Sequence, residues 1–383
     1  MNASALRDLL ISWADLNSGS DNFAGLERLR AALAVEFALL PGATVEHVGL
    51  ADIPAKILRV TVRPQAPRQI LLSGHYDTVY GADHSFQRCT LLDEATLRGP
   101  GVADMKGGLV VLLAALREFE KSPHATHLGY EILLTPDEET GSAASRPVLE
   151  AAAASRRHAF ALVFEPARAN GNLVKSRKGT GIFTVTVHGR AAHAGRDPAA
   201  GRNAILALCE LLPRIDALNR ELPGVMFNVG AIRGGGAVNI VPEFASADVN
   251  VRITQPTDEP AFLRRAAEIL APLNARDGFR AEFTGRFNRR PKIASPSEEK
   301  LFAAWQSCAR EFGVALDWEH VGGGSDGNLL SAAGLPNLDG LGPVGDRLHS
   351  PDEFVRLPSL VERAQIAASF LAKFAAGGIA VPS

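Results

Sequence analysis

The residues most able to do chemistry are histidines and acids that follow short apolar stretches of the chain. His75 and Asp77 lie in SGHYDTV, directly after the apolar run QILL. Because residues two apart on a strand face the same side, both side chains can point together from the end of a strand. A carboxylate beside a ligating imidazole fixes its tautomer, so the pair suits a metal ligand and its partner. A polar loop with a hydrogen-bonded histidine is the alternative.

Three further segments place acids beside predicted strands or helices. Asp104 lies in GPGVADMKGG, just ahead of a predicted helix, where it could instead serve only as the helix N-cap. Glu138 and Glu139 lie in TPDEETGS after the apolar run YEILL, and Glu165 follows FALVF. Acids that crowd together repel one another unless cations or protons compensate them. For the PDEE run, a solvated acidic loop is the alternative interpretation.

A second candidate histidine, His349, lies in LHSPDEF near the last predicted strand. Two histidines and several carboxylates, without thiolates, suit zinc, and cobalt or manganese fit the same ligand types as substitutes. Two ions that share one carboxylate would lower the pKa of a water molecule and polarise a carbonyl. A spare carboxylate must then move the proton. Glu138 and Glu139 could divide the roles of proton shuttle and metal ligand.

The composition restricts the class of partner. The 383 residues are 46% hydrophobic, which allows sizeable cores and excludes an intrinsically disordered chain. Forty basic and 42 acidic residues give a net charge of −2, so charge gives no reason to expect nucleic acid or an anionic membrane. No apolar run approaches the roughly 20 residues that span a bilayer, and the first residues have neither the basic head nor the unbroken apolar core expected of a secretory signal. With three scattered cysteines, we expect a cytoplasmic protein whose partner is a small molecule.

The order of the predicted elements divides the chain into two parts. Helices and short apolar strands alternate up to about residue 164. The same pattern returns near the C-terminal end, with helices at about 297–313 and 358–375. This alternation predicts an α/β fold with a mostly parallel sheet sandwiched by helices. Residues 176–286 instead follow the order β-α-β-β-α-β, which indicates an inserted domain. We therefore expect a catalytic, metal-binding domain at 1–175 and 287–383.

Six motifs together resemble the co-catalytic di-zinc hydrolase family: SGHYDTV, GPGVADMKGG, PDEETGS, FEP, GRAAHAG and LHSPDEF. This family includes glutamate carboxypeptidase, aminoacylase, acetylornithine deacetylase and succinyl-diaminopimelate desuccinylase. The resemblance spans nearly the whole chain and keeps the order of the motifs. It implies a zinc-peptidase type of fold, two Zn²⁺ ions per subunit, and a homodimer. The inserted domain would be both a lid and the dimer interface.

The resemblance also implies a role for individual residues. The metal ligands would be His75 and Glu165 on the first zinc, Glu139 and His349 on the second, and Asp104 bridging both. Asp77 would orient the first histidine. Glu138 would be the general base that takes a proton from water and later delivers it to the departing nitrogen.

Three residues of the insertion match further family positions. His193, in GRAAHAG, resembles the residue that reaches across from the partner subunit to stabilise the tetrahedral oxyanion. Arg252 resembles the arginine that grips the free carboxylate of the substrate, which suits the guanidinium fork. Asn239 matches a family asparagine near the same pocket. Taken without the resemblance, the arginine would indicate a surface ion pair and the asparagine a turn.

We therefore expect a zinc-dependent hydrolase that cleaves an amide bond in a small substrate with a free carboxylate. Tyr80, just after SGHYDTV, and glutamate rather than aspartate at position 165 favour a glutamate-carboxypeptidase-like metallopeptidase. The alternative is an N-acyl-amino-acid deacylase of the acetylornithine deacetylase or succinyl-diaminopimelate desuccinylase type. A remote alternative is an inactive binding relative, which should have lost a ligand or the base.

Overall fold

The computed structural model describes residues 1–380, and the chain forms two compact units. The first unit contains Met1–Ser176, Ile293–Val321 and the chain from Ser325. The second contains Arg177–Lys292 together with Gly322–Gly324. The boundary expected at residue 286 falls inside strand β12 (Arg280–Arg289), which continues the sheet of the second unit.

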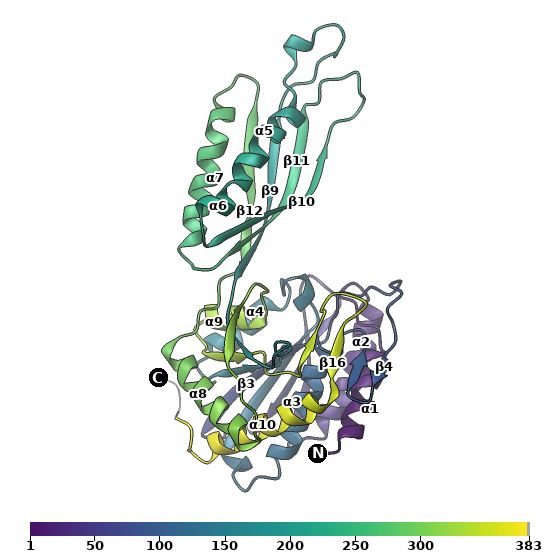
Figure 1. Cartoon of the computed structure of the whole chain (residues 1–383), viewed down its shortest axis with the longest axis vertical. Helices are drawn as coiled ribbons and strands as arrows, with labels where there is room; N and C mark the ends of the chain where they lie inside the picture. The colour runs from purple at the N-terminus through teal and green to yellow at the C-terminus, as the bar shows by residue number, and fades with distance from the viewer. Residues whose placement is uncertain (381–383) are drawn as a thin grey trace. The chain divides into compact units, whose positions relative to one another are not determined.

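The first unit is built on an eight-stranded sheet in the order β1-β2-β6-β3-β7-β14-β8-β13 (Figure 1). The strands are β1 Thr44–Gly49, β2 Lys56–Val62, β3 Arg68–His75, β6 Leu128–Thr135, β7 Ala161–Val163, β8 Leu173–Arg177, β13 Trp318–Val321 and β14 Asn337–Asp339. The central strands β6, β3, β7 and β14 are parallel, as predicted. Strands β1 and β2 at one edge and β8 beyond β14 are antiparallel to their neighbours. The carboxyl ends of β3, β6 and β7 therefore meet at one edge of the sheet.

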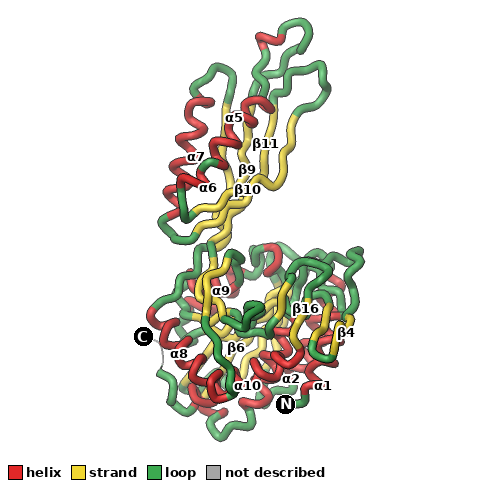
Figure 2. The backbone as a smooth tube through the Cα atoms, viewed as in Figure 1, coloured by secondary structure: helices red, strands yellow, loops and turns green. Residues whose placement is uncertain are grey.

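Successive residues of the central strands face opposite layers of helices. Ile70 and Leu72 belong to one apolar core, whereas Leu71 between them belongs to another. The first core includes helices α1 Ala3–Ala14, α2 Phe23–Ala38, α3 Lys106–Phe119, α8 Pro296–Glu311 and α10 Leu357–Ala375. The second includes α4 Arg146–Ala154 and α9 Asp326–Ala332. Figure 2 shows the strands of this unit enclosed by helices, so the expected α/β sandwich is confirmed.

A small antiparallel sheet in the first unit was not predicted from the sequence. Its order is β15-β16-β5-β4, with bounds Gly345–Asp346, Phe354–Arg356, Thr96–Arg98 and Thr90–Asp93. Pairing of β16 with β5 ties the loop that carries His349 to the strand that leads into the glycine-rich turn 99–104. Two short 3₁₀ helices complete the unit, Ala125–His127 and Glu138–Thr140.

The second unit has a four-stranded antiparallel sheet in the order β10-β11-β9-β12. Its elements are β9 Gly179–His188, the 3₁₀ turn Pro198–Ala200, α5 Ala204–Asp216, α6 Leu218–Glu221, β10 Val225–Gly234, β11 Phe244–Ile253, α7 Asp258–Asn274 and β12 Arg280–Arg289. Apart from the one-turn α6, this is the predicted β-α-β-β-α-β order. Helices α5 and α7 bury their apolar sides against the sheet in one core. In neither unit does a described helix combine the length and apolar character needed to cross a membrane.

Candidate metal centre and active site

The predicted ligands of the first unit come from strand ends and two turns. His75 is the last residue of β3, the turn Glu138–Thr140 follows β6, and Glu165 follows β7. Parallel strands put their carboxyl ends at one edge of the sheet, where open α/β sheets place their sites. Asp104 comes from the turn before α3, and His349 from the loop between β15 and β16.

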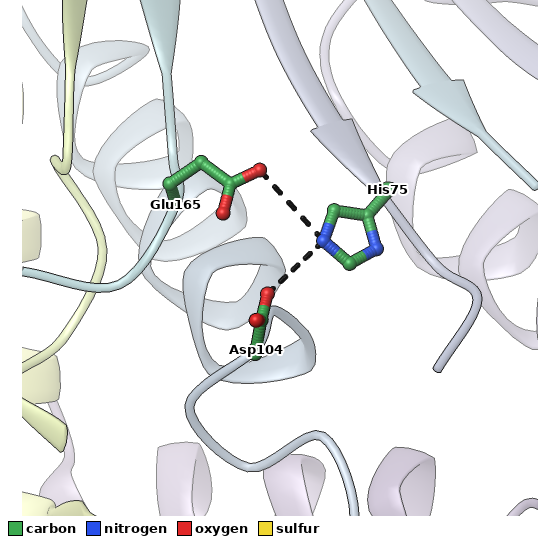
Figure 3. A group of neighbouring side chains, drawn as sticks. All are labelled: His75, Asp104 and Glu165. Carbon is green, nitrogen blue, oxygen red and sulfur yellow. Dashed lines mark hydrogen bonds and ion pairs between the residues drawn. The ribbon is translucent and has the colours of Figure 1, made fainter. Parts of the chain in front are cut away.

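His75, Asp104 and Glu165 form a buried group (Figure 3). The Nε2 atom of His75 lies 3.1 Å from Oδ1 of Asp104 and 3.7 Å from Oε1 of Glu165. Figure 3 shows both carboxylates facing this one ring nitrogen. Two buried carboxylates that converge on one ring nitrogen favour a positive charge at this point.

A second group shares Asp104. The Nε2 atom of His349 lies 3.1 Å from Oε2 of Glu139 and 3.5 Å from Oδ2 of Asp104. In each group the potential ligand atoms lie within 4.8 Å of one another. One oxygen of Asp104 thus faces His75 and the other faces His349, which is the arrangement that a carboxylate bridging two ions requires.

The pKa values at this centre show a surplus of negative charge. Burial raises the pKa of Glu139 to about 8, with a further contribution from the charge of Asp104 that outweighs the hydrogen bond to His349. Hydrogen bonds to Asp104 and Glu139 raise the pKa of His349 to about 11. Burial alone would raise the pKa of Asp104, but hydrogen bonds to both histidines hold it below its usual range. Without a metal ion, bound protons therefore balance the charge of these carboxylates. Divalent cations could take the place of the protons.

The donor set fits a two-ion centre. Two imidazoles and three carboxylates contribute, and no thiolate does, which suits Zn²⁺ or a similar ion.

The alternative role for Asp104 as a helix cap is not observed. The N-cap of α3 is Met105, and no side chain caps this helix end.

Asp77 connects the first histidine to the acidic turn. Its Oδ1 atom lies 3.3 Å from Nδ1 of His75. Its two oxygens also accept hydrogen bonds from the amides of Glu138 and Glu139, both at 3.1 Å, and from the hydroxyl of Ser20 at 2.8 Å. The fully buried Asp77 therefore holds both the ring of His75 and the turn that carries Glu138. Glu138 is itself buried, and its charge contributes to the raised pKa of Glu139.

Sequence reasoning gave no role to several polar residues that support this centre. Glu353 lies within the LHSPDEF motif, and its carboxylate accepts hydrogen bonds from the turn that carries Asp104. Asp326, the first residue of α9, accepts hydrogen bonds from the hydroxyls of Thr135 and Ser142 on either side of the acidic turn. Both acids are buried. The only signal for Glu353 in the sequence was its place four residues after His349.

The remaining predicted site residues lie in the second unit. The segments that carry His193 and Asn239 are adjacent, because the amide of Ala194 donates to the carbonyl of Asn239 at 2.9 Å. Both residues are exposed. Arg252, on β11, donates from Nη1 to the carbonyl of Gly322 at 2.6 Å.

Arg177 was not selected from the sequence, yet it contacts the same glycine run as Arg252, Gly322–Gly324. Its Nη1 atom donates to the carbonyl of Gly323 at 3.4 Å, next to the carbonyl that Arg252 contacts. Arg177 is buried, whereas Arg252 is half-buried. Two guanidinium groups therefore meet adjacent backbone carbonyls in this unit.

Comparison with solved structures shows the fold. The chain aligns with a tripeptidase from Staphylococcus aureus at a TM-score of 0.82 and 21% identity, covering 98% of this chain and 99% of that one. It aligns with the aminopeptidase PepT from Bacillus cereus at a TM-score of 0.79 and 19% identity, covering 97% and 99%.

Comparison of sequences shows the family. Carboxypeptidase G2 from Pseudomonas sp. (strain RS-16) is 27% identical over 330 residues, which cover 82% of this chain and 76% of that protein. The succinyl-diaminopimelate desuccinylase of Xanthomonas euvesicatoria pv. vesicatoria is 31% identical over 353 residues, covering 87% and 88%. Residues 71–373 match the sequence model of peptidase family M20/M25/M40. This chain is therefore a hydrolase that belongs to peptidase family M20/M25/M40.

Proposed function

We propose that this protein is a di-zinc hydrolase that cleaves an amide bond in a small substrate with a free carboxylate. The observation that carries the proposal is the position of Asp104, whose two oxygens face two different histidines. The buried carboxylate of Glu138 lies beside this centre, where its charge acts on Glu139.

In this proposal the five clustered side chains are the metal ligands. His75 and Glu165 would hold one Zn²⁺ ion, Glu139 and His349 would hold the other, and both ions would share Asp104. When bound, two such ions make a water molecule more acidic and polarise the carbonyl group of the substrate. Co²⁺ and Mn²⁺ fit the same donor types as substitutes.

The chain itself supplies the proton transfer. Glu138 takes a proton from the attacking water and delivers it to the departing nitrogen, the usual double role of the base in amide hydrolysis. Asp77 keeps the Nε2 atom of His75 free to bind metal, because the Nδ1 side faces its carboxylate. His193, supplied by a second copy of this chain, donates a hydrogen bond to the oxyanion of the tetrahedral intermediate.

The substrate is proposed from the binding residues and the relatives. Arg252 would bind the free carboxylate, with Asn239 in the same pocket. Similarity to carboxypeptidase G2, together with Tyr80 and Glu165, favours a glutamate-carboxypeptidase-like peptidase. The second candidate is an N-acyl-amino-acid deacylase of the acetylornithine deacetylase or desuccinylase type, favoured by 31% identity to a succinyl-diaminopimelate desuccinylase over 87% of the chain.

The proposal is tested with a substrate panel and one variant. The zinc- or cobalt-loaded protein is assayed on N-acyl-glutamates, dipeptides, N-acetylornithine and N-succinyl-diaminopimelate. Arg252→Ala should raise KM roughly 10- to 100-fold for substrates with a free carboxylate and leave their amidated analogues unaffected, because only the former lose a charge-assisted hydrogen bond. Arg233→Ala is the matched control, because Arg233 is an exposed arginine of the same unit that pairs with Asp248.

Two results would contradict the proposal. The first is turnover that survives complete chelation of metal. The second is an Arg252→Ala variant whose KM is unchanged on every carboxylate substrate.

A cytoplasmic location and a homodimer formed through the second unit, which would also be the lid, belong to the same proposal. Sedimentation of the zinc-loaded protein tests the dimer.

A further inference from the structure

Glu353 is a buried carboxylate that holds the turn carrying Asp104. It is 1% exposed, and its Oε1 atom accepts hydrogen bonds from the amides of Ala103 at 2.9 Å and Asp104 at 3.0 Å. Its Oε2 atom accepts a third hydrogen bond from the amide of Gly101 at 3.1 Å. Burial raises the pKa of Glu353, and the amide hydrogen bonds oppose that rise. Three of the amides of this short turn are therefore fixed by one side chain.

Tyr80 connects the same carboxylate to the two histidine-bearing segments. Its hydroxyl lies 2.9 Å from Oε2 of Glu353 and 2.8 Å from the carbonyl oxygen of Ser350, the residue after His349. Tyr80 itself ends the short segment that begins with His75. It is 3% exposed, so its hydroxyl depends on these protein partners for hydrogen bonds.

We infer that Glu353 and Tyr80 are positioning residues that join segments 75–80, 99–104 and 349–353, so that Asp104 faces both histidines. The inference rests on the metal centre of the proposed function. Neither residue is one of the five clustered donors. Their role is to set where donors from three distant parts of the chain meet.

The two ion sites depend on this pair to different degrees. His75 ends a central strand and Glu165 follows another, so the sheet holds these two ligands of the first site. His349 lies in a loop, its side chain is 55% exposed, and its φ is 60°, in the left-handed region that non-glycine residues rarely adopt. The second site therefore relies more on Tyr80 and Glu353 for the position of its histidine.

The experiment measures metal binding directly, without substrate. Metal-free protein is titrated with Co²⁺ in the presence of a competing chelator, and bound cobalt is counted by elemental analysis. Glu353→Gln replaces one accepting oxygen with an NH₂ group that faces backbone N–H donors. Binding of Co²⁺ at the second site, that of Glu139 and His349, should weaken roughly 10- to 100-fold, the usual cost of losing an outer partner of a metal site. The change at the first site should be smaller. Tyr80→Phe should weaken the second Co²⁺ alone, by a smaller factor, because it leaves the three amide hydrogen bonds of Glu353 in place.

Glu298→Gln is the matched control. Glu298 is 2% exposed, and its carboxylate also accepts backbone hydrogen bonds, from the amides of Ser295 at 2.7 Å and Asn337 at 3.1 Å, but at the start of α8. This variant should lose stability and still bind two Co²⁺ ions as the wild type does. Turnover of Glu353→Gln should recover at saturating Co²⁺, because a positioning residue takes no part in the reaction.

The outcomes separate this inference from the proposed function. Wild-type protein that binds no Co²⁺ would overturn both. If the wild type binds two ions and both variants bind them with wild-type affinity, the inference alone is overturned. Equal weakening of the two sites would overturn it as well. Circular dichroism checks folding, and if Glu353→Gln does not fold, Tyr80→Phe decides.

Discussion

Strand β6 contains one buried acid, Glu131, and leads into a cluster of acids that includes Glu139. The two carboxylates differ in which groups balance their negative charge. In the strand, the carboxylate of Glu131 lies 3.0 Å from Nε of Arg59 and 3.2 Å from Nε2 of His158. After the strand, Glu139 shares its surroundings with Asp104 and has one partly exposed imidazole, that of His349, as its partner.

The same type of side chain responds in opposite ways. Burial alone would raise the pKa of Glu131, but the hydrogen bond to His158 and the charges of His158 and Arg59 bring it below its usual value. Burial and the charge of Asp104 raise the pKa of Glu139 to about 8. A buried carboxylate that pairs with a cation of the chain, as Glu131 does with Arg59, needs no external ion. A cluster with more carboxylates than cations marks a site for an external cation.

The largest effect expected from this difference is on catalysis. Glu138→Gln should lower kcat roughly 10²- to 10⁴-fold, the usual contribution of a general base, and leave the content of bound zinc unchanged. Steady-state kinetics and elemental analysis on the same preparation measure both. Glu131→Gln, on the same strand, should keep the wild-type kcat. An equal loss of kcat in Glu138→Gln and Glu131→Gln would contradict separate roles for the two groups of acids.

The next effect is on stability and separates the groups by their response to metal. Zinc bound only to the native state at 100 times its dissociation constant should add about 2.7 kcal/mol to the free energy of unfolding, seen as a higher Tm. Glu131→Gln should show the same gain as the wild type, and Asp104→Asn a much smaller one. A wild-type Tm that does not respond to zinc in differential scanning calorimetry would contradict the assignment of the cluster as a metal centre.

The smallest effect concerns pH. Because the pKa of Glu131 lies below its ordinary value of 4.5, its ion pairs stabilise the folded protein above that pH and lose this contribution as the pH falls through the lowered pKa. Glu131→Gln should therefore cost about 1–3 kcal/mol at pH 7 in urea unfolding, and the difference from wild type should shrink on acidification below 4.5.

Glu46→Gln is the control for this measurement. Glu46 is an exposed partner of the same arginine, with 3.4 Å between the charged groups, so its loss should cost at most about 1 kcal/mol. A difference between wild type and Glu131→Gln that stays constant from pH 7 to strongly acidic pH would show that the charge of Glu131 contributes nothing.

Local patterns in the sequence were enough to predict much of the architecture. Short apolar runs such as QILL and YEILL predicted central strands, and the helical spacing from Leu109 to Leu116 predicted α3. The change to β-α-β-β-α-β order located the second unit. These features are readable because strand and helix periodicities of 2 and 3.6 residues are properties of neighbouring residues. The short strands β4, β5, β15 and β16 were missed, since two to four residues are too few to show a period.

By itself, the sequence of this protein determined the types of donor and the strand ends where they lie, because both depend on residues close together in the chain. Only the tertiary structure decided that the two oxygens of Asp104 face different histidines, that Glu353 binds the amides beneath Asp104, and that Arg177 joins Arg252 at the glycine run. These contacts join residues up to 252 positions apart, as Gly101 and Glu353 are. Their hydrogen bonds depend on burial, which long-range packing creates and no local pattern records.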